Sequence, residues 1–344
     1  MHYKRDTGRI FIGVPAALAL ALLTSSIDAR GAELPPLERV GTIALRGAVG
    51  GLDHLALDTK RGRLFVANTA NDSLDIVDLK AGTLLKQITG QGRIRGVTYS
   101  PEVNRIFVGN GDGGVCNTFD GESYELLRSV SLGADADNVR YSPRTHRIYV
   151  VHADTELSVI DAKDFTLLSP IALPKSLGAF QLEAKRPRMY INAKDAGVVV
   201  AIELDSDRII NRFDVAPAGV NAALANDEPN HRLFVGCRRD PSLVVMDSDT
   251  GKDVDRVPIP GDVDDVSFHA RNGRIYASCG DGAIAVIRRI GSDRYQALTP
   301  VATVKGARTS ILDSEDGHFY LAVPRRADRP AQAHAEVWVY QVRS

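Results

Sequence analysis

One short motif recurs seven times along the 344-residue chain: an arginine or histidine, then an apolar, an aromatic and another apolar residue. Successive copies lie 41 to 44 residues apart. Their first residues, termed the anchors, are Arg63, Arg105, Arg147, Arg188, Arg232, Arg274 and His318. A fixed period of this length indicates a repeat architecture, in which each unit buries its apolar surface against its neighbours.

Each repeat is expected to contain four short strands. The segment after each anchor is rich in β-branched and aromatic residues, and polar turn residues such as 112–114 separate it from a third apolar segment. Short runs of β-forming residues between turns, with no helical period, indicate an all-β chain. Four strands in about 42 residues favour a β-propeller, a ring of four-stranded blades, over a solenoid.

The two ends of the chain are predicted to meet in the last blade. The seventh repeat ends with its third predicted strand, residues 337–342, and residues 37–45 match the fourth-strand pattern of earlier repeats. We therefore expect the N-terminal strand to complete the seventh blade and close the ring, because closure removes exposed sheet edges. One domain, residues 33–344, then accounts for most of the chain.

The first 32 residues predict a secretory signal peptide. Lys4, Arg5 and Arg9 precede an apolar run at residues 10–23, and small residues follow at 29–32. A run of fourteen residues is shorter than the roughly 20 that a membrane helix needs, and it fits the apolar region of a signal peptide. The mature protein is therefore expected to be periplasmic or secreted, with no membrane span.

Composition and motifs exclude several classes of function. A net charge of −1 gives no basic surface for nucleic acid. The three cysteines lack the spacings of zinc ribbons and covalent haem sites, and no haem, nucleotide or flavin motif is present. Cys237 and Cys279 occupy equivalent positions in adjacent repeats, and the sequence leaves open whether they form a disulfide.

The sequence pattern of the repeat is similar to that of a known family. Residues 63–68 with 74–78, and residues 147–152 with 157–161, combine an arginine-led strand with a third strand that ends in aspartate. This sequence pattern resembles the YVTN-type β-propeller repeat from about residue 37 to residue 342. The Gly-His and Trp-Asp motifs of WD repeats are absent. The resemblance implies an exported seven-bladed propeller of the bacterial type. It implies function only broadly, since related propellers include binding proteins, scaffolds, lactonases and cofactor-associated accessory proteins.

Two consecutive positions of each repeat define a candidate site. They lie ten and nine residues before the anchor, where the innermost strand of each blade is predicted to begin at one mouth of the central channel. In the fifth repeat we allow a turn two residues longer. The ligand-binding residues predicted in this way are Asp53, His54, Arg95, Asp137, Asn138, Asn221, Asp264, Asp265 and Arg308.

Two interpretations of this ring stay open. Arginine and aspartate alternate along part of it, which is typical of a structural girdle of salt bridges. Alternatively, four acids outnumber two arginines, and a bound cation would complete the ring. Asp53, Asp137 and Asp265 are then the candidate metal ligands, and Ca²⁺ is the candidate ion because it prefers carboxylate oxygens.

The leading hypothesis for function is a binding or scaffold protein. It would present the channel mouth to a small molecule, a metal or an unidentified protein partner. The sequence identifies no ligand or substrate and decides neither enzymatic activity nor oligomeric state. The alternative is a lactonase-like hydrolase, in which a metal polarises the lactone carbonyl and His54 acts as the general base.

Overall fold

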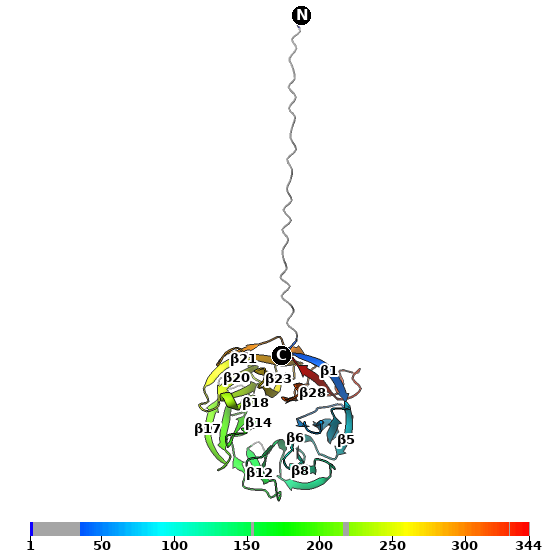
Figure 1. Ribbon diagram of the computed structural model, residues 1–344, viewed down its shortest axis with the longest axis vertical. Coiled ribbons are helices and arrows are strands. Elements are labelled where there is room, and N and C mark those ends of the chain that lie inside the picture. Colours follow the sequence, from blue (N-terminus) through cyan, green and yellow to red (C-terminus); the bar gives the residue numbers. More distant parts are fainter. Residues whose placement is uncertain (3–34, 153–154, 216–219, 330, 344) are drawn as a thin grey trace. The chain divides into compact units, whose positions relative to one another are not determined.

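A computed structural model of the chain describes residues 1–2, 35–152, 155–215, 220–329 and 331–343. Most of the predicted signal peptide, residues 3–32, lies outside these ranges. Seven antiparallel sheets, each built on four strands, follow one another around a ring (Figure 1). The chain is a seven-bladed β-propeller. In the part of the chain that is described, no helix is long and apolar enough to cross a membrane.

The strands fall into four sets, from the channel outward. The innermost strands of blades one to seven are β2 (Leu55–Asp58), β6 (Ile94–Ser100), β10 (Ala136–Ser142), β14 (Leu177–Leu182), β18 (Asn221–Asp227), β22 (Val263–His269) and β27 (Ser310–Asp313). The second strands all begin at an anchor: β3 (Arg63–Asn68), β7 (Arg105–Asn110), β11 (Arg147–His152), β15 (Arg188–Ala193), β19 (Arg232–Cys237), β23 (Arg274–Cys279) and β28 (His318–Val323). The predicted repeat is therefore confirmed at its anchors.

The outer half of each blade completes the sheet. The third strands are β4 (Ser73–Asp78), β8 (Val115–Asp120), β12 (Glu156–Asp161), β16 (Val198–Glu203), β20 (Ser242–Asp247), β24 (Ala283–Arg289) and β29 (Glu336–Val342). The outermost strands are β5 (Thr83–Thr89), β9 (Leu126–Ser131), β13 (Ile171–Ala172), β17 (Arg208–Asp214), β21 (Asp253–Pro258), the short pair β25 (Tyr295–Ala297) and β26 (Val301–Ala302), and β1 (Leu37–Ala44). Two 3₁₀ turns, η1 (Thr69–Asn71) and η2 (Glu228–Asn230), lie in loops.

The N-terminal strand closes the ring as expected. β1 pairs antiparallel with β29, from Leu37 opposite Val342 to Ala44 opposite Glu336. In Figure 1 this blue strand lies against the red C-terminal blade. Leu37 is buried among residues of blades six and seven, whereas Ile43 is buried among residues of blades seven and one. One outer strand thus stabilises two interfaces between blades.

A β-bulge in the outermost strand makes this double role geometrically feasible. The pairing of β1 with β29 shifts between Arg39 and Gly41, which leaves Val40 as an extra residue. An extra residue reverses the alternation of side chains beyond it. The same shift occurs in four other outer strands, at Leu85, Leu127, Ile210 and Val254. In β5, Leu84 consequently packs toward blade seven and Ile88 toward blade two.

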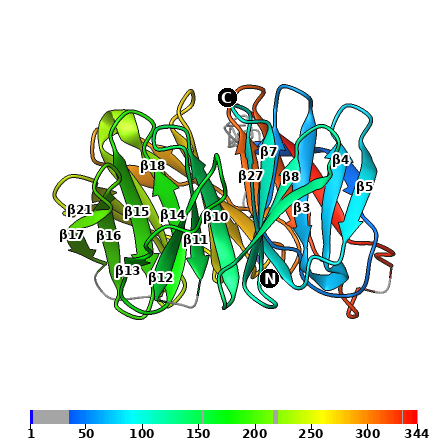
Figure 2. The same cartoon turned by 90° about the horizontal axis from the view of Figure 1, so that it is seen from below.

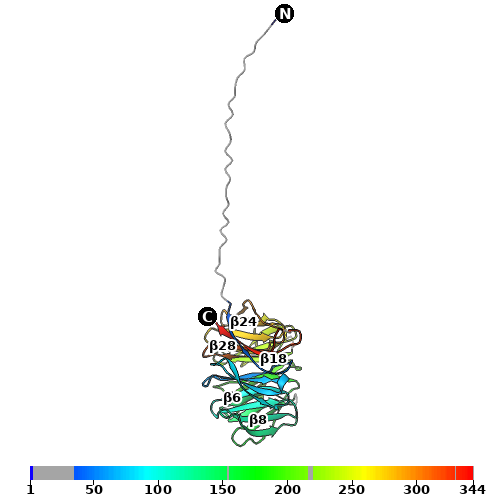
Figure 3. The same cartoon turned by 90° about the vertical axis from the view of Figure 1, so that its right-hand side faces the viewer.

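The core lies between the faces of neighbouring blades, which Figures 2 and 3 show from the side. Each large apolar cluster contains side chains from two adjacent blades, such as Phe180 and Tyr149 in the cluster of blades three and four. All three cysteines are buried and free, so Cys237 and Cys279 do not form a disulfide. Burial raises the pKa of the Cys237 thiol to about 11 and that of Cys279 to about 12.

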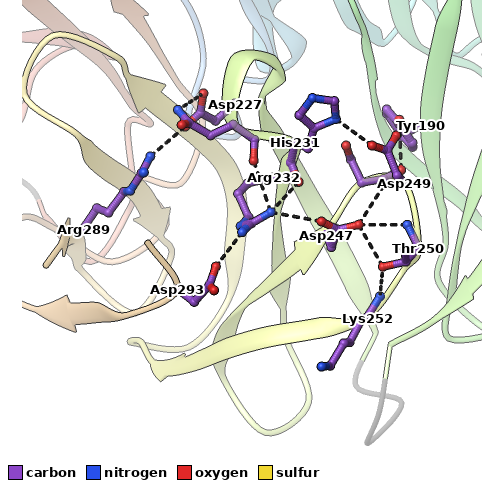
Figure 4. Close-up of polar contacts among 12 residues, drawn as sticks. Tyr190, Asp227, His231, Arg232, Asp247, Asp249, Thr250, Lys252, Arg289 and Asp293 are labelled. Carbon is purple, nitrogen blue, oxygen red and sulfur yellow. Dashed lines mark hydrogen bonds and ion pairs between the residues drawn. The ribbon is translucent and has the colours of Figure 1, made fainter. Parts of the chain in front are cut away.

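The turns lie on two opposite faces of the ring. The loops before the innermost strands and between the second and third strands share one face, termed the mouth face. The other face, termed the turn face, carries the anchors. There Arg232 bonds to Asp247 of its own blade at 3.1 Å and to Asp293 of the next blade (Figure 4). Arg289 of blade six in turn lies 3.6 Å from Asp227 of blade five. The charged residues of this face therefore tie adjacent blades together.

Candidate ligand site at the channel mouth

The mouth residues project from irregularities at the start of the innermost strands. In blades two, three and six, the pairing with the second strand shifts at Arg95, at Asp137 and at Asp264. A bulge leaves a residue unpaired and redirects its side chain. The backbones are also close here, since a Cβ on Gly96 would lie 1.9 Å from the Asp137 carbonyl oxygen. Such crowding leaves these side chains only the channel mouth to occupy.

Seven of the nine predicted residues line one small pocket of about 110 Å³. They are Asp53, His54, Arg95, Asp137, Asn138, Asp264 and Arg308. Asp265 lies on the far side of His54 and lines a second cavity in the channel, together with His54 itself. His54 therefore separates the pocket from the channel below it.

Asn221 does not face the mouth. Its side-chain amide donates to the Asn192 side chain and to the Val198 carbonyl oxygen, both at 2.9 Å. Asn221 pairs with Cys237 as Val263 pairs with Cys279 in the next blade. The longer turn that we allowed in the fifth repeat is therefore wrong, and Ala222 holds the position that Asp264 holds in blade six.

Arg95 joins three carboxylates at the mouth. Its Nη2 lies 3.0 Å from Asp137 Oδ2, its Nη1 lies 3.2 Å from Asp135 Oδ2, and its Nε lies 3.7 Å from Asp53 Oδ2. Burial alone would lower the pKa of Arg95, but the attraction of these acids outweighs it and raises the pKa above its usual value. The guanidinium thus occupies the space between Asp53 and Asp137.

Arg308 and Arg238 hold Asp264 on the opposite side. Arg308 Nε lies 3.0 Å from Asp264 Oδ2, and Arg308 Nη1 lies 3.0 Å from Asp262 Oδ2. Arg238 pairs with Asp264 and also donates to the Val263 carbonyl oxygen at 2.8 Å. Burial still raises the pKa of Asp264 overall, although both arginines lower it.

Arg238 and Lys194 line the pocket, and sequence reasoning missed both. Each comes directly after a second strand, six residues beyond its anchor. Sequence reasoning also missed Asp135 and Asp262, which lie two residues before the predicted ring positions Asp137 and Asp264. Inspecting the position six residues after the anchor in every repeat would have found Lys194 and Arg238.

His54 sits between two carboxylates. Its Nε2 lies 3.6 Å from Asp53 Oδ1, and its Nδ1 lies 3.6 Å from Asp265 Oδ1. Burial lowers the pKa of His54, but Asp265 and then Asp53 outweigh this effect and raise the pKa to about 10. The imidazole is therefore protonated at neutral pH and cannot accept a proton, so His54 is unsuited to the role of general base.

The pKa of Asp53 is also raised, but here burial is the main cause. Burial raises the pKa of its carboxyl to about 7, although the His54 imidazolium lowers it. Asp137 and Asp264 add to the increase because their negative charges repel a third carboxylate. Asp53 is thus the mouth group that changes charge near neutral pH.

The mouth does not fit the predicted Ca²⁺ site. Ligand atoms of Asp53, His54 and Asp137 lie within 4.8 Å of one another, but Arg95 already contacts both carboxylates and His54 carries a proton. Ca²⁺ takes six to eight oxygen ligands, and the third candidate, Asp265, lies beyond the imidazole. The mouth also holds charges that the predicted ring did not include, since Arg238 and Lys194 add positive charge and Asp135 and Asp262 add negative charge.

Comparisons with known proteins bear on the fold. No family model matches the sequence, and no curated protein matches it. A chain from "Crystal Structure of Mitotic Checkpoint Complex" is similar with a TM-score of 0.76 at 13% identity, over 98% of this chain and 100% of that one. The WD40 repeats of RRP9 are similar with a TM-score of 0.76 at 13% identity, over 89% and 100% of the two chains.

A third similar structure is Kuenenia stuttgartiensis hydrazine synthase, with a TM-score of 0.71 at 12% identity, over 81% of this chain and 94% of that one. Identities this low show a shared propeller fold and nothing about activity. The resemblance to the YVTN-type repeat stays a prediction.

Proposed function

We propose that this chain is an exported, YVTN-type binding protein whose mouth pocket holds a small polar ligand with both a positive and a negative group. The observation that carries the proposal is the convergence of side chains from all seven blades on one pocket of about 110 Å³. A pocket that contains both acidic and basic side chains can contact a positive and a negative group of one ligand. A zwitterion is therefore favoured over a simple ion.

Three groups in the pocket have bonding capacity to spare. Asp137 Oδ1 and Asn138 Oδ1 are buried, and neither has a hydrogen-bond partner among the described residues. Both are acceptors, and an ammonium group would satisfy them. Lys194 has no carboxylate partner in the described ranges, so it is available to a ligand carboxylate. A protein partner that offers such groups on a loop would fit the same pocket, and one of the similar chains comes from a mitotic checkpoint complex.

Calorimetric titration with glycine, β-alanine and glycine betaine tests this proposal. At least one should bind the wild type, and Lys194→Gln should weaken binding at least about tenfold, because a hydrogen bond to a charged group contributes about 1.5–3 kcal/mol. Asp137→Asn should likewise weaken the binding of glycine and β-alanine, the two ligands that carry an ammonium group. Lys163→Gln is the matched control, since Lys163 is exposed on the turn face. Absence of heat with all three compounds at millimolar concentration would reject a zwitterion site.

A hydrolase remains the second candidate because of Asp53. A carboxylate with a pKa of about 7 is poised to exchange protons at neutral pH, as catalytic acids and bases are. Asp53, and not His54, would then be the general base. Hydrolysis of δ-valerolactone should rise as pH passes through 7 and disappear in Asp53→Asn. A wild-type rate equal to the uncatalysed rate would reject this candidate.

Export rests on the basic, apolar and small-residue order of residues 1–32. Expression of the full chain in a bacterium should yield a mature protein that begins between residues 30 and 33 in the periplasmic fraction. Mass spectrometry of the purified protein measures this end. An intact Met1 on the folded protein would contradict export by a cleaved signal.

A further inference from the structure

The channel below His54 contains a second, larger cavity. Its volume is about 490 Å³, and innermost strands of six blades line it. Thr59, Ser314 and Glu315, which follow innermost strands on the turn face, lie at its open end. His54 lines both this cavity and the mouth pocket. This larger space, termed the chamber, therefore adjoins the mouth pocket at His54 and reaches the turn face at its other end.

One position of the innermost strands supplies much of the lining of this chamber. The innermost-strand position seven residues before each anchor faces the channel, and six of the seven residues at this position line the chamber: Ala56, Thr98, Arg140, Gln181, Ser267 and Ile311. The seventh is Ala225. Arg140 is the only charged residue in this ring, between Thr98 of blade two and Gln181 of blade four.

The Arg140 guanidinium lacks an anionic partner. Its Nη1 donates to the Val139 carbonyl oxygen at 2.9 Å, and the group lies 5.6 Å from the centre of the Phe180 ring. Within the described residues, no carboxylate lies within 4.0 Å of Arg140. Burial lowers the pKa of Arg140, and the opposing attraction of Asp265 and Asp137 offsets this effect only in part.

Two of the three acids that line the chamber make contacts elsewhere. Asp265 contacts His54 at 3.6 Å and accepts the Ser310 N–H at 2.8 Å. Asp313 accepts the backbone N–H of Glu315 at 3.0 Å in a turn at the open end. Asp265 attracts Arg140 at longer range, but among the described residues neither these two carboxylates nor that of Glu315 forms an ion pair with it.

We propose that this chamber binds a small organic carboxylate, with the carboxylate on Arg140 and an apolar body toward the open end. Leu55, Val97 and Val266 supply apolar lining, and hydroxyl groups of Thr98 and Ser267 are the nearby polar ones. A volume of about 490 Å³ lies in the range of ligand pockets. Arg140 and the protonated His54 supply the positive charge of the chamber, and three acids also line it. This balance favours a monocarboxylate over a phosphate or a dianion, which would need more positive charge. This site is distinct from the mouth pocket and does not rest on the function proposed for it.

Titration with benzoate tests the site, with benzyl alcohol and benzylamine as controls for the charge. The wild type should bind benzoate and should bind neither control as tightly. Arg140→Gln should weaken benzoate binding at least about tenfold, the loss expected for one charge-assisted bond. Lys194→Gln, which alters only the mouth pocket, should leave benzoate binding unchanged.

A second variant keeps the test decisive if Arg140→Gln fails to fold. Gln181 holds the same ring position in the next blade and donates to the Leu224 carbonyl oxygen at 2.8 Å. Gln181→Glu would remove this one hydrogen bond and place an internal carboxylate in the chamber at nearly constant volume. This variant should lose benzoate binding while the protein stays folded. Absence of benzoate binding by the wild type at millimolar concentration would overturn the proposal, as would equal binding by the Arg140 or Gln181 variant. Loss of benzoate binding in Lys194→Gln would place benzoate at the mouth and overturn it also.

Discussion

Replacing Leu37 by alanine should loosen the closure of the ring. Leu37 is 2% exposed and packs against Tyr276, Phe319 and Tyr340. Leu→Ala removes three buried carbons, a loss of about 2.4 kcal/mol at about 0.8 kcal/mol per carbon. The cavity left between these rings cannot collapse fully, so we expect a total cost of about 3–4 kcal/mol. Val40→Ala is the matched control, because Val40 is 54% exposed on the same strand and its loss should cost less than about 0.5 kcal/mol.

Trp338 makes this prediction directly measurable. It is the single tryptophan of the chain, it pairs with Thr42 across the closing strands, and the Arg39 guanidinium lies 4.4 Å from its ring. In urea, Trp338 fluorescence should report separation of β1 from β29, while circular dichroism reports loss of all seven blades. Leu37→Ala should move the fluorescence midpoint to lower urea than Val40→Ala does. Equal midpoints for the two variants would refute the assignment of closure energy to Leu37.

The channel residues and the thiols give three more predictions. The pKa of His54 rises from 6.5 to about 10 on folding, so its protonation stabilises the fold fully below pH 6.5, and this contribution is lost as pH rises through 10. The free energy of unfolding should therefore fall between pH 6.5 and pH 10 in the wild type and fall less in His54→Gln. Gly96→Ala, which drives a Cβ against the Asp137 carbonyl oxygen, should cost roughly 3 kcal/mol, whereas Gly51→Ala, with open space around its Cβ, should not lower the melting temperature. A thiol reagent should label no cysteine in the native protein and three in urea; two unreactive thiols in urea would contradict the unpaired state of Cys237 and Cys279.

The repeat determined the fold because its signal is redundant. All seven second strands begin at their anchors, so an error in one repeat would have been exposed by the other six. Closure by residues 37–45 could likewise be predicted from the sequence. The last repeat lacks a fourth strand, the N-terminal segment has the pattern of a fourth strand, and pairing the two completes the blade.

The site was predicted less completely, for reasons of local geometry. Asn221 was misplaced because turn length was adjusted from sequence, whereas the register against Cys237 is set by a bulge that leaves no mark in residue type. The predicted charge balance was incomplete because it counted one ring only. Arg238 and Lys194 reach the mouth from the loops after the second strands, and Asp135 and Asp262 reach it from the loops before the innermost strands. The pKa of Asp53 depends on burial, which only the assembled ring creates.

The extra residue in five outer strands restricts how this chain tolerates changes in length. Removing Leu85 would restore continuous pairing of β5 with β4, with Leu84 still opposite Val77 and Ile88 still opposite Leu74, so both side chains would keep their present faces. The same change would straighten a free sheet edge, and straight edges pair with those of other molecules. Loss of the extra residue from an outer strand should therefore spare the packing between blades and promote association of molecules along the rim of the ring.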